Sequence, residues 1–167
     1  YLSGGRHRFM AWWEWKRLRC ARTFIVTLTV TDDDGGVGFD TLTVTVRIRI
    51  CIKPRCFPHS INLNDRGLLP VAILGSSSFD VMSINPSTVE LGGVDLATRG
   101  PEKAPRLAYS YEDVNGDGCL DMVAFFKVQD LVTAGALTPS TTELTLTGAL
   151  YDGTPIQGTD TVRIVPP

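Results

Sequence analysis

The sequence contains no apolar run approaching the roughly 20 residues that a membrane-spanning helix needs, so it predicts no membrane insertion. The apolar segment 9–15 is short and lacks the small-residue cleavage pattern of a secretory leader. Because the chain begins at Tyr1 rather than Met, we expect the natural N-terminus to lie further upstream. Evidence for export must therefore come from the rest of the chain.

Short enzyme motifs are also missing. The sequence has no nucleophile elbow, phosphate-binding loop, zinc-protease helix motif or dinucleotide fingerprint. His7 and His59 stand alone in the sequence, with no nucleophile near either of them. An acid pair drawn from Glu90, Asp95 and Glu143 is the remaining enzymatic alternative, but sequence separation does not give their distance. We therefore predict that the protein is not an enzyme.

Cysteine is scarce, with four residues at positions 20, 51, 56 and 119. No paired C-x-x-C or clustered histidine accompanies them, so the spacing does not indicate a zinc site. An even number permits disulfides, and four cysteines allow three connectivities. We favour free cysteines.

Neither positive nor negative charge dominates the sequence, since the formal net charge is −2. We therefore expect no nucleic-acid partner. The average hides a basic segment at residues 1–22, which holds six Lys or Arg residues, one Glu and three Trp. This segment shows neither strand alternation nor helix caps. We interpret it as a disordered or non-native lead-in, with a basic membrane- or RNA-binding segment as the alternative.

Most of the remaining sequence alternates with period two, as half-buried strands require. Residues 23–31 (TFIVTLTVT) and 41–50 (TLTVTVRIRI) flank a glycine-rich turn and predict a β-hairpin. Further strands are predicted at 68–74, 88–91, 106–112, 120–128, 143–151 and 161–165, and a helix at most at 130–136. The expected fold is all-β: an antiparallel sandwich, immunoglobulin-like or jelly-roll-like, at 51–167, preceded by the hairpin at 23–50.

One loop carries a strong chemical pattern. Residues 113–121 (DVNGDGCLD) place side-chain oxygens at positions 1, 3, 5 and 9 of a calcium-type loop, and glycine at position 6. The predicted Ca²⁺ ligands are Asp113, Asn115, Asp117, Asp121 and the backbone carbonyl of Cys119. Two further residues complete the prediction: Glu112, beside the loop, would support the ligands without touching the ion, and Leu120 would anchor the loop to the core.

Position 12 of the same loop is Ala124, so the bidentate glutamate of a helix-flanked EF-hand is missing. The strands predicted on either side point to a loop carried by a β-hairpin, with the weak affinity typical of extracellular modules. Asp and Asn also form turns by bonding to their own backbone, so a plain β-turn remains the alternative.

Two stretches resemble known families. Residues 23–46, with VTLTVTDDDGG followed by DTLTVTV, resemble the last two strands of a PKD domain, an immunoglobulin-like sandwich of extracellular proteins. Residues 52–166 resemble an uncharacterised β-rich module of secreted bacterial and archaeal proteins, through SINLNDRGLLPVAILGS, YEDVNGDGCLD and LTLTGALYDGTPIQGTD. The resemblance implies an extracellular location beside other domains of a larger secreted protein, and carries no established activity.

We therefore expect a non-catalytic, extracellular structural or adhesion module that calcium stabilises at residues 113–121. The alternative is a carbohydrate-binding accessory module of a secreted hydrolase, for which exposed aromatic residues beside the loop would be the sign. Polysaccharide or a cell-surface protein would then be the partner. A further alternative is assembly through the unpaired edges of the hairpin at 23–50.

Overall fold

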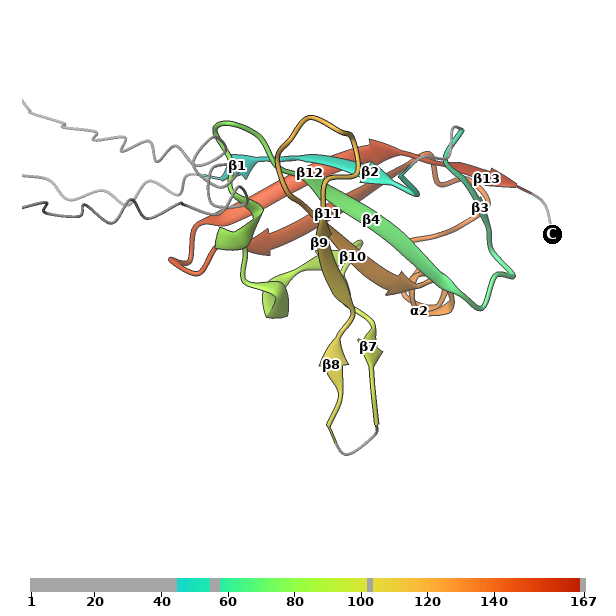
Figure 1. Cartoon of the computed structure of the whole chain (residues 1–167). Helices are drawn as coiled ribbons and strands as arrows, with labels where there is room; N and C mark the ends of the chain where they lie inside the picture. The colour runs from blue at the N-terminus through green and yellow to red at the C-terminus, as the bar shows by residue number, and fades with distance from the viewer. Residues whose placement is uncertain (1–44, 55–57, 102–103, 166–167) are drawn as a thin grey trace, which may run out of the picture.

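The computed structural model describes residues 45–54, 58–101 and 104–165. The basic segment at 1–22 and all but the end of the predicted hairpin at 23–50 lie outside these ranges, as does the PKD-like resemblance up to residue 44. In the described part the chain is nearly all β, with two main sheets, two small two-stranded sheets and one short helix (Figure 1). The predicted all-β class is confirmed.

The larger sheet has five strands in the order β1-β12-β11-β5-β6. Their bounds are β1 Val46–Arg47, β12 Pro155–Thr161, β11 Glu143–Ala149, β5 Glu90–Leu91 and β6 Val94–Asp95. β11 and β12 form a hairpin in which Ala149 pairs with Pro155 across the Asp152 turn. The predicted turn is confirmed, but the returning strand is 155–161 rather than 161–165.

The second main sheet has four strands in the order β2-β4-β10-β9. These are β2 Arg49–Ile52, β4 Leu68–Leu74, β10 Asp121–Lys127 and β9 Tyr109–Glu112. β4 lies between β2 and β10 and is paired on both edges, which explains its nearly continuous apolar sequence. The strands predicted at 68–74 and 120–128 are confirmed.

A single hydrophobic core joins the two sheets. The four-stranded sheet contributes Ile50, Ile52, Val71, Ile73, Met122, Ala124 and Phe126, and the five-stranded sheet contributes Leu91, Leu144, Leu146 and Ile156. Side chains of the two sheets therefore pack against each other, as in a β-sandwich.

The chain passes from one sheet to the other near Ile48. Its N–H donates to the carbonyl oxygen of Gln157 at 2.9 Å, after which β2 pairs with β4. Gly158 permits this crossing, because a Cβ there would lie 2.8 Å from the Ile48 carbonyl oxygen. The described end of the segment 23–50 is thus built into the sandwich, and β2 continues across residue 50.

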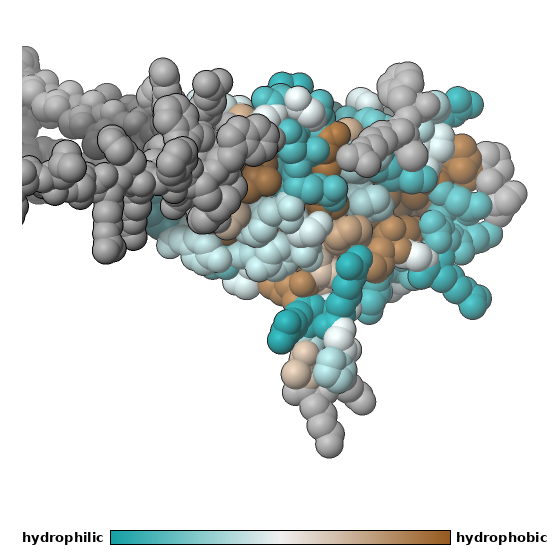
Figure 2. Space-filling view, in the orientation of Figure 1, coloured by the Kyte–Doolittle hydropathy of each residue, from teal (hydrophilic) through white to brown (hydrophobic). Residues whose placement is uncertain are grey.

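Smaller elements complete the described part. β13 (Arg163–Val165) runs parallel to β3 (Ser60–Asn62), and β7 (Thr98–Arg99) pairs with β8 (Arg106–Leu107) in an arm that stands out from the body (Figures 1 and 2). Two 3-10 turns, η1 (Val81–Ser83) and η2 (Pro86–Thr88), lead to β5.

The helix α2 spans Val128–Thr133, two residues earlier than the sequence predicts. None of the helices in the described ranges has the length and apolar character needed to cross a bilayer.

Candidate functional sites

The acidic loop connects β9 to β10. Asp121, the first residue of β10, pairs with Glu112, the last residue of β9, so residues 113–120 form the loop of an antiparallel hairpin. The prediction of a hairpin-borne loop rather than a helix-flanked one is confirmed. Glu112 is exposed on β9, beside the loop.

Asp113 shapes the first half of the loop. Its Oδ1 accepts a hydrogen bond from the Gly116 N–H at 2.7 Å, and its Oδ2 accepts one from the Gly118 N–H at 2.9 Å. Both glycines have positive φ, 77° and 86°, a conformation that most other residues rarely adopt. One carboxylate therefore holds two sharp turns of the backbone in place.

Asn115 and Asp117 continue the same pattern. Asn115 Oδ1 accepts from the Asp117 N–H at 2.9 Å, and Asp117 Oδ1 accepts from the Cys119 N–H at 2.8 Å. The Asn115 Nδ2 amide donates to Asp117 Oδ2 at 3.0 Å. These local bonds are the Asx turns that the β-turn alternative predicts, and they leave second lone pairs on the oxygens.

Asp121 anchors the loop. It is fully buried, and its carboxylate accepts hydrogen bonds from the Gly75 N–H at 2.8 Å and the Val114 N–H at 2.9 Å. Burial raises the pKa of this carboxyl, the two hydrogen bonds lower it, and the charges of Asp117 and Asp113 raise it further. Leu120, predicted to anchor the loop, is 40% exposed, so that prediction is wrong. Asp121 anchors the loop instead, because its buried carboxylate accepts hydrogen bonds from two backbone N–H groups.

The carboxylates of the loop are near enough to influence one another, but they do not form a tight group. Among the described residues, no three acid, Cys or His side chains of the loop bring their ligand atoms within 4.8 Å of one another. The donors themselves, carboxylate, amide and carbonyl oxygens, are the hard ligands that Ca²⁺ prefers. The loop has the right donor set, and must tighten to close it around an ion.

The cysteines differ from the sequence prediction at one position. Cys119, whose backbone carbonyl is a predicted ligand, is disulfide-bonded through its side chain. Cys51 is free, as predicted. Because Cys51 is free, a Cys51–Cys56 bridge is excluded; Cys20 and Cys56 lie outside the described residues.

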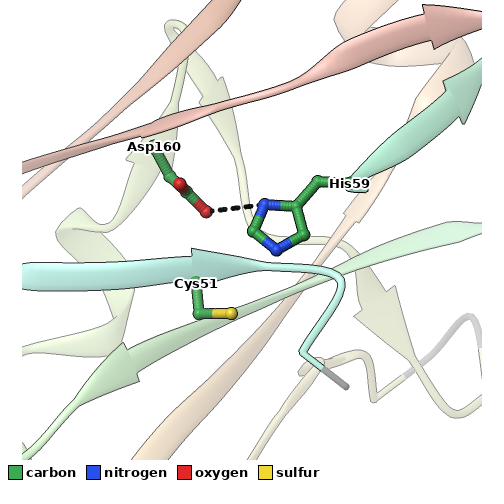
Figure 3. A group of neighbouring side chains, drawn as sticks. All are labelled: Cys51, His59 and Asp160. Carbon is green, nitrogen blue, oxygen red and sulfur yellow. Dashed lines mark ion pairs between the residues drawn. The ribbon is translucent and has the colours of Figure 1, made fainter. Parts of the chain in front are cut away.

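A second cluster joins Cys51 on β2, His59 just before β3 and Asp160 on β12 (Figure 3). One potential ligand atom from each residue lies within 4.8 Å of the other two. His59 Nδ1 is 3.2 Å from Asp160 Oδ2, and the two side chains are 15% and 19% exposed. No other group of three such side chains in the described ranges is as close.

Backbone contacts hold the acid and the imidazole of this cluster in place. Asp160 accepts hydrogen bonds from the Ile52 N–H and from the Thr161 N–H, both at 2.8 Å. His59 Nδ1 lies 3.3 Å from the Thr161 carbonyl oxygen, and the His59 carbonyl oxygen accepts from the Arg163 N–H at 3.0 Å. The cluster therefore lies where β2, β3 and β12 are tied together.

Lys53 closes the connection between two of these strands. It has a positive φ of 50°, which is unusual for a residue with a side chain, and its Nζ donates to the Ser60 carbonyl oxygen at 2.7 Å. The end of β2 is thereby held next to the start of β3. This contact helps bring His59 back toward Cys51.

The Cys51 thiol has a raised pKa, because of burial first and then the charges of Asp160 and Asp121. Cysteine nucleophiles need the opposite shift, since the thiolate is the reactive form. Although cysteine hydrolases also combine Cys, His and an acid or amide, this environment does not favour a nucleophile.

Sequence reasoning missed this cluster. His59 appears isolated along the chain, whereas the fold places it beside a thiol and a carboxylate that come from strands remote in sequence. The only local sign is the position of Cys51, which alternates with the buried Ile50 and Ile52 and so points away from the core. No spacing rule links it to Asp160.

The fold brings together two of the three acids that the enzymatic alternative requires, Glu90 and Asp95. Glu90 pairs with Asp95 across β5 and β6, while the β11 residue opposite Glu90 is Thr147, four positions from Glu143. Two of the three acids are therefore neighbours. They lie on a two-residue ladder at the edge of a sheet, with Asp95 exposed.

The aromatic residues divide between core and surface. Phe126 is fully buried, and Phe125 lies beneath the Arg99 guanidinium at 4.2 Å. Tyr109, 38% exposed, meets Tyr111 edge to face with ring centroids 5.6 Å apart. Phe126 therefore belongs to the core, while Tyr109 is available at the surface.

Comparisons with known proteins give a fold-level likeness only. No protein-family model matches the sequence, and no curated protein does. Among solved structures, the chain is similar to a bacterial immunoglobulin-like domain from the M. primoryensis ice-binding adhesin, with 14% sequence identity and a TM-score of 0.36. The match covers 72% of this chain and 98% of that one. A likeness this distant identifies no ligand or partner, and the all-β assignment rests on the sheets themselves.

Proposed function

We propose that this protein is a non-catalytic structural or adhesion module of an extracellular protein, and that one calcium ion rigidifies its loop at residues 113–121. The observation that carries the proposal is the gathering of oxygen donors in one short hairpin loop, where the side chains of Asp113, Asn115 and Asp117 fold back onto the turns that lead to the buried Asp121. Burial is the first cause of the raised pKa of Asp121, and the negative charges of Asp117 and Asp113 raise it further, so they repel its charged form. A bound divalent cation would offset that repulsion.

The ordered turns of the loop backbone support the same proposal. Asp113, Asn115 and Asp117 already hold the backbone in successive turns, so little chain entropy remains to be lost when an ion binds. Asp121 contributes differently, because both its oxygens accept from backbone N–H groups and the side chain is fully buried. We expect Asp113, Asn115, Asp117 and the Cys119 carbonyl to bind the ion directly, and Asp121 to join them through a free lone pair or a water molecule.

Calcium would act here through linkage. An ion that binds only the folded form adds RT ln(1 + [L]/Kd) to the free energy of unfolding. For about 2 mM calcium and a Kd of about 0.1 mM, the gain is roughly 1.8 kcal/mol. An extracellular location fits this range, because only there is calcium concentrated enough to fill a loop that lacks the bidentate glutamate.

Thermal unfolding with and without calcium tests the proposal. We expect calcium to raise the Tm of the wild type by several degrees and to leave Asp117→Ala nearly unchanged. Asp152→Asn, at the exposed turn between β11 and β12, is the matched control and should respond like the wild type. Equal melts for the wild type with and without calcium would leave Asx turns as the whole role of the loop.

A carbohydrate-binding accessory role is the second candidate, favoured by two exposed tyrosines near Tyr111 on β9. Tyr109 and Tyr151 are 38% and 69% exposed, and both lie near enough to Tyr111 to raise its pKa, after the larger effect of burial. Aromatic faces of this kind stack against sugars. Retention on insoluble polysaccharides that is lost in Tyr109→Ala and Tyr151→Ala would support this role, and no retention of the wild type would rule it out.

A further inference from the structure

We propose that Cys51, His59 and Asp160 form a binding site for a tetrahedral divalent transition-metal ion, and that zinc is the ion this site fits best. The site is separate from the calcium loop in position and in chemistry. It consists of one thiol, one imidazole and one carboxylate from three strand regions (Figure 3).

The donor set selects the metal. Calcium and magnesium take oxygen ligands almost exclusively, whereas zinc binds thiolate sulfur, imidazole nitrogen and carboxylate oxygen together. Cobalt(II) takes the same donors in the same geometry and serves as a spectroscopic probe. Three protein ligands leave a fourth position for water or another ligand.

The geometry requires only small movements. Zinc bonds of about 2.0–2.3 Å in a tetrahedron place the ligand atoms about 3.3–3.8 Å apart. His59 Nδ1 and Asp160 Oδ2 are already 3.2 Å apart, and all three ligand atoms lie within 4.8 Å of one another. Binding would replace the ion pair between His59 and Asp160 with two bonds to the metal.

The surroundings keep the ligands in register when that ion pair is replaced. Asp160 Oδ1 accepts from the Thr161 N–H, and Oδ2 accepts from the Ile52 N–H and has a second lone pair for an ion, so the carboxylate stays oriented when a metal binds. The carbonyl oxygen of His59 is held by the Arg163 N–H. Cys51 lies within β2, whose register with β4 is fixed by four residue pairs. Ligands on paired strands lose little freedom on binding, which favours a specific site.

The ion pair alone does not account for the cluster. An imidazole and a carboxylate would satisfy each other without a thiol beside them, yet Cys51 offers its sulfur within 4.8 Å of a ligand atom of each. A divalent cation would engage all three groups, because it neutralises the carboxylate and stabilises the thiolate at once. When the metal binds, the thiol proton is released to solvent, and the proton that His59 Nδ1 shares with Asp160 leaves that nitrogen, either to Nε2 or to solvent.

Cobalt(II) titration of the full chain, after chelator treatment and without reductant so that the Cys119 disulfide stays closed, tests the site. We expect one ion per chain, a thiolate-to-cobalt charge-transfer band, and the intense visible bands of tetrahedral cobalt. Zinc should abolish these bands by competition, while millimolar calcium should leave them unchanged. Cys51→Ser should lose the charge-transfer band, and His59→Ala and Asp160→Asn should weaken binding at least tenfold.

Controls separate this site from other thiols and from the loop. Asp117→Asn and Asp152→Asn should bind cobalt as the wild type does. Far-ultraviolet circular dichroism of each variant shows whether it is folded, and the wild-type spectrum is decisive even if Cys51→Ser unfolds. No charge-transfer band in the wild type, or a band that survives in folded Cys51→Ser, overturns the proposal.

Discussion

Two aspartates in this molecule do similar work in different settings. Asp121 is fully buried and its carboxylate accepts hydrogen bonds from Gly75 and Val114, whereas Asp160 is 19% exposed at its side chain and bonds Ile52 and Thr161. Each carboxylate ties its own strand to another segment of the chain. Water can replace lost contacts at Asp160 but not at Asp121, so the same chemical change should cost more at the buried site.

The two aspartates also differ in how far apart in the sequence their contacts lie. Most contacts of the Asp121 loop lie within nine residues of one another, while Asp160 meets Ile52 across 108 positions of sequence. Both charges nevertheless act on Cys51, whose pKa they raise. Cys51 and Asp121 lie on β2 and β10, on either side of β4, so we expect the charge at the loop to act on the thiol of the other cluster.

The largest expected effect is at Gly75, the residue that donates to Asp121. A Cβ at this position would lie 2.1 Å from the Leu120 carbonyl oxygen, a backbone atom that cannot move without displacing the loop. We expect Gly75→Ala to lower the free energy of unfolding by at least about 3 kcal/mol and to weaken calcium binding with it. Urea denaturation followed by circular dichroism measures the first effect, and a calcium titration measures the second.

Gly67→Ala is the matched control for that substitution. Its new Cβ would meet only the Asp65 side chain, at 3.0 Å, and a side chain can rotate away. We expect a change within about 1 kcal/mol. Equal losses for the two variants would mean that close approach of β4 to the loop does not limit stability.

The next effect compares the two aspartates directly. Asp121→Asn keeps one acceptor oxygen, but its amide group faces a buried backbone N–H that then has neither an acceptor nor access to water. We therefore expect the free energy of unfolding to fall by about 2 kcal/mol. Asp160→Asn should cost about 1 kcal/mol, because solvent reaches its side chain. Both are measured by urea denaturation in calcium-free, metal-free buffer. A larger loss for Asp160→Asn would reverse the comparison and make the strand junction the more important of the two.

The fold class was predictable because its signals are local. A nearly continuous apolar run located β4, and the acidic motif located the loop between β9 and β10. Strand-like segments beside the motif and the Asp152 turn located β10 and β11, although the strand that returns from this turn is 155–161. Strand partners were less predictable: 163–165 pairs with β3 in parallel, and the strand predicted at 106–112 is interrupted at the buried Ala108. Partner choice depends on packing of the whole chain, which alternation does not encode.

The candidate sites show the same division. The oxygen-bearing residues of the loop could be named from the sequence, since their spacing is the signal, but the buried anchoring role of Asp121 could not. Leu120 looked like the anchor because it is apolar, yet the chain turns there so that the following carboxylate faces inward. The cluster of Cys51, His59 and Asp160 could not be predicted from the sequence, because no local pattern indicates it. It depends on the three-dimensional contacts among β2, β3 and β12.

The smallest expected effect tests the electrostatic link between the two sites. Asp160 raises the pKa of the Cys51 thiol, so removing its charge in Asp160→Asn should lower that pKa. In chelator-treated protein, the pH profile of Cys51 alkylation by iodoacetamide should then shift to lower pH, with a rate at pH 8 about a few-fold higher. Peptide-level mass spectrometry assigns the reaction to Cys51.

The shift of the profile, rather than the rate alone, carries the argument. A variant that merely exposed the thiol would raise the plateau rate at high pH as well as lower the midpoint, because burial is the largest cause of the raised pKa. A lower midpoint with an unchanged plateau therefore identifies the lost charge as the cause. Asp121→Asn provides the second arm, because it removes the charge that has the smaller effect on the pKa of Cys51 and leaves the junction of β2 with β12 intact. A lower midpoint in both variants, larger for Asp160→Asn, establishes that charge acts on the thiol from both sides. An unchanged midpoint in Asp121→Asn would separate the two sites, and each would then have to be understood through its own strands alone.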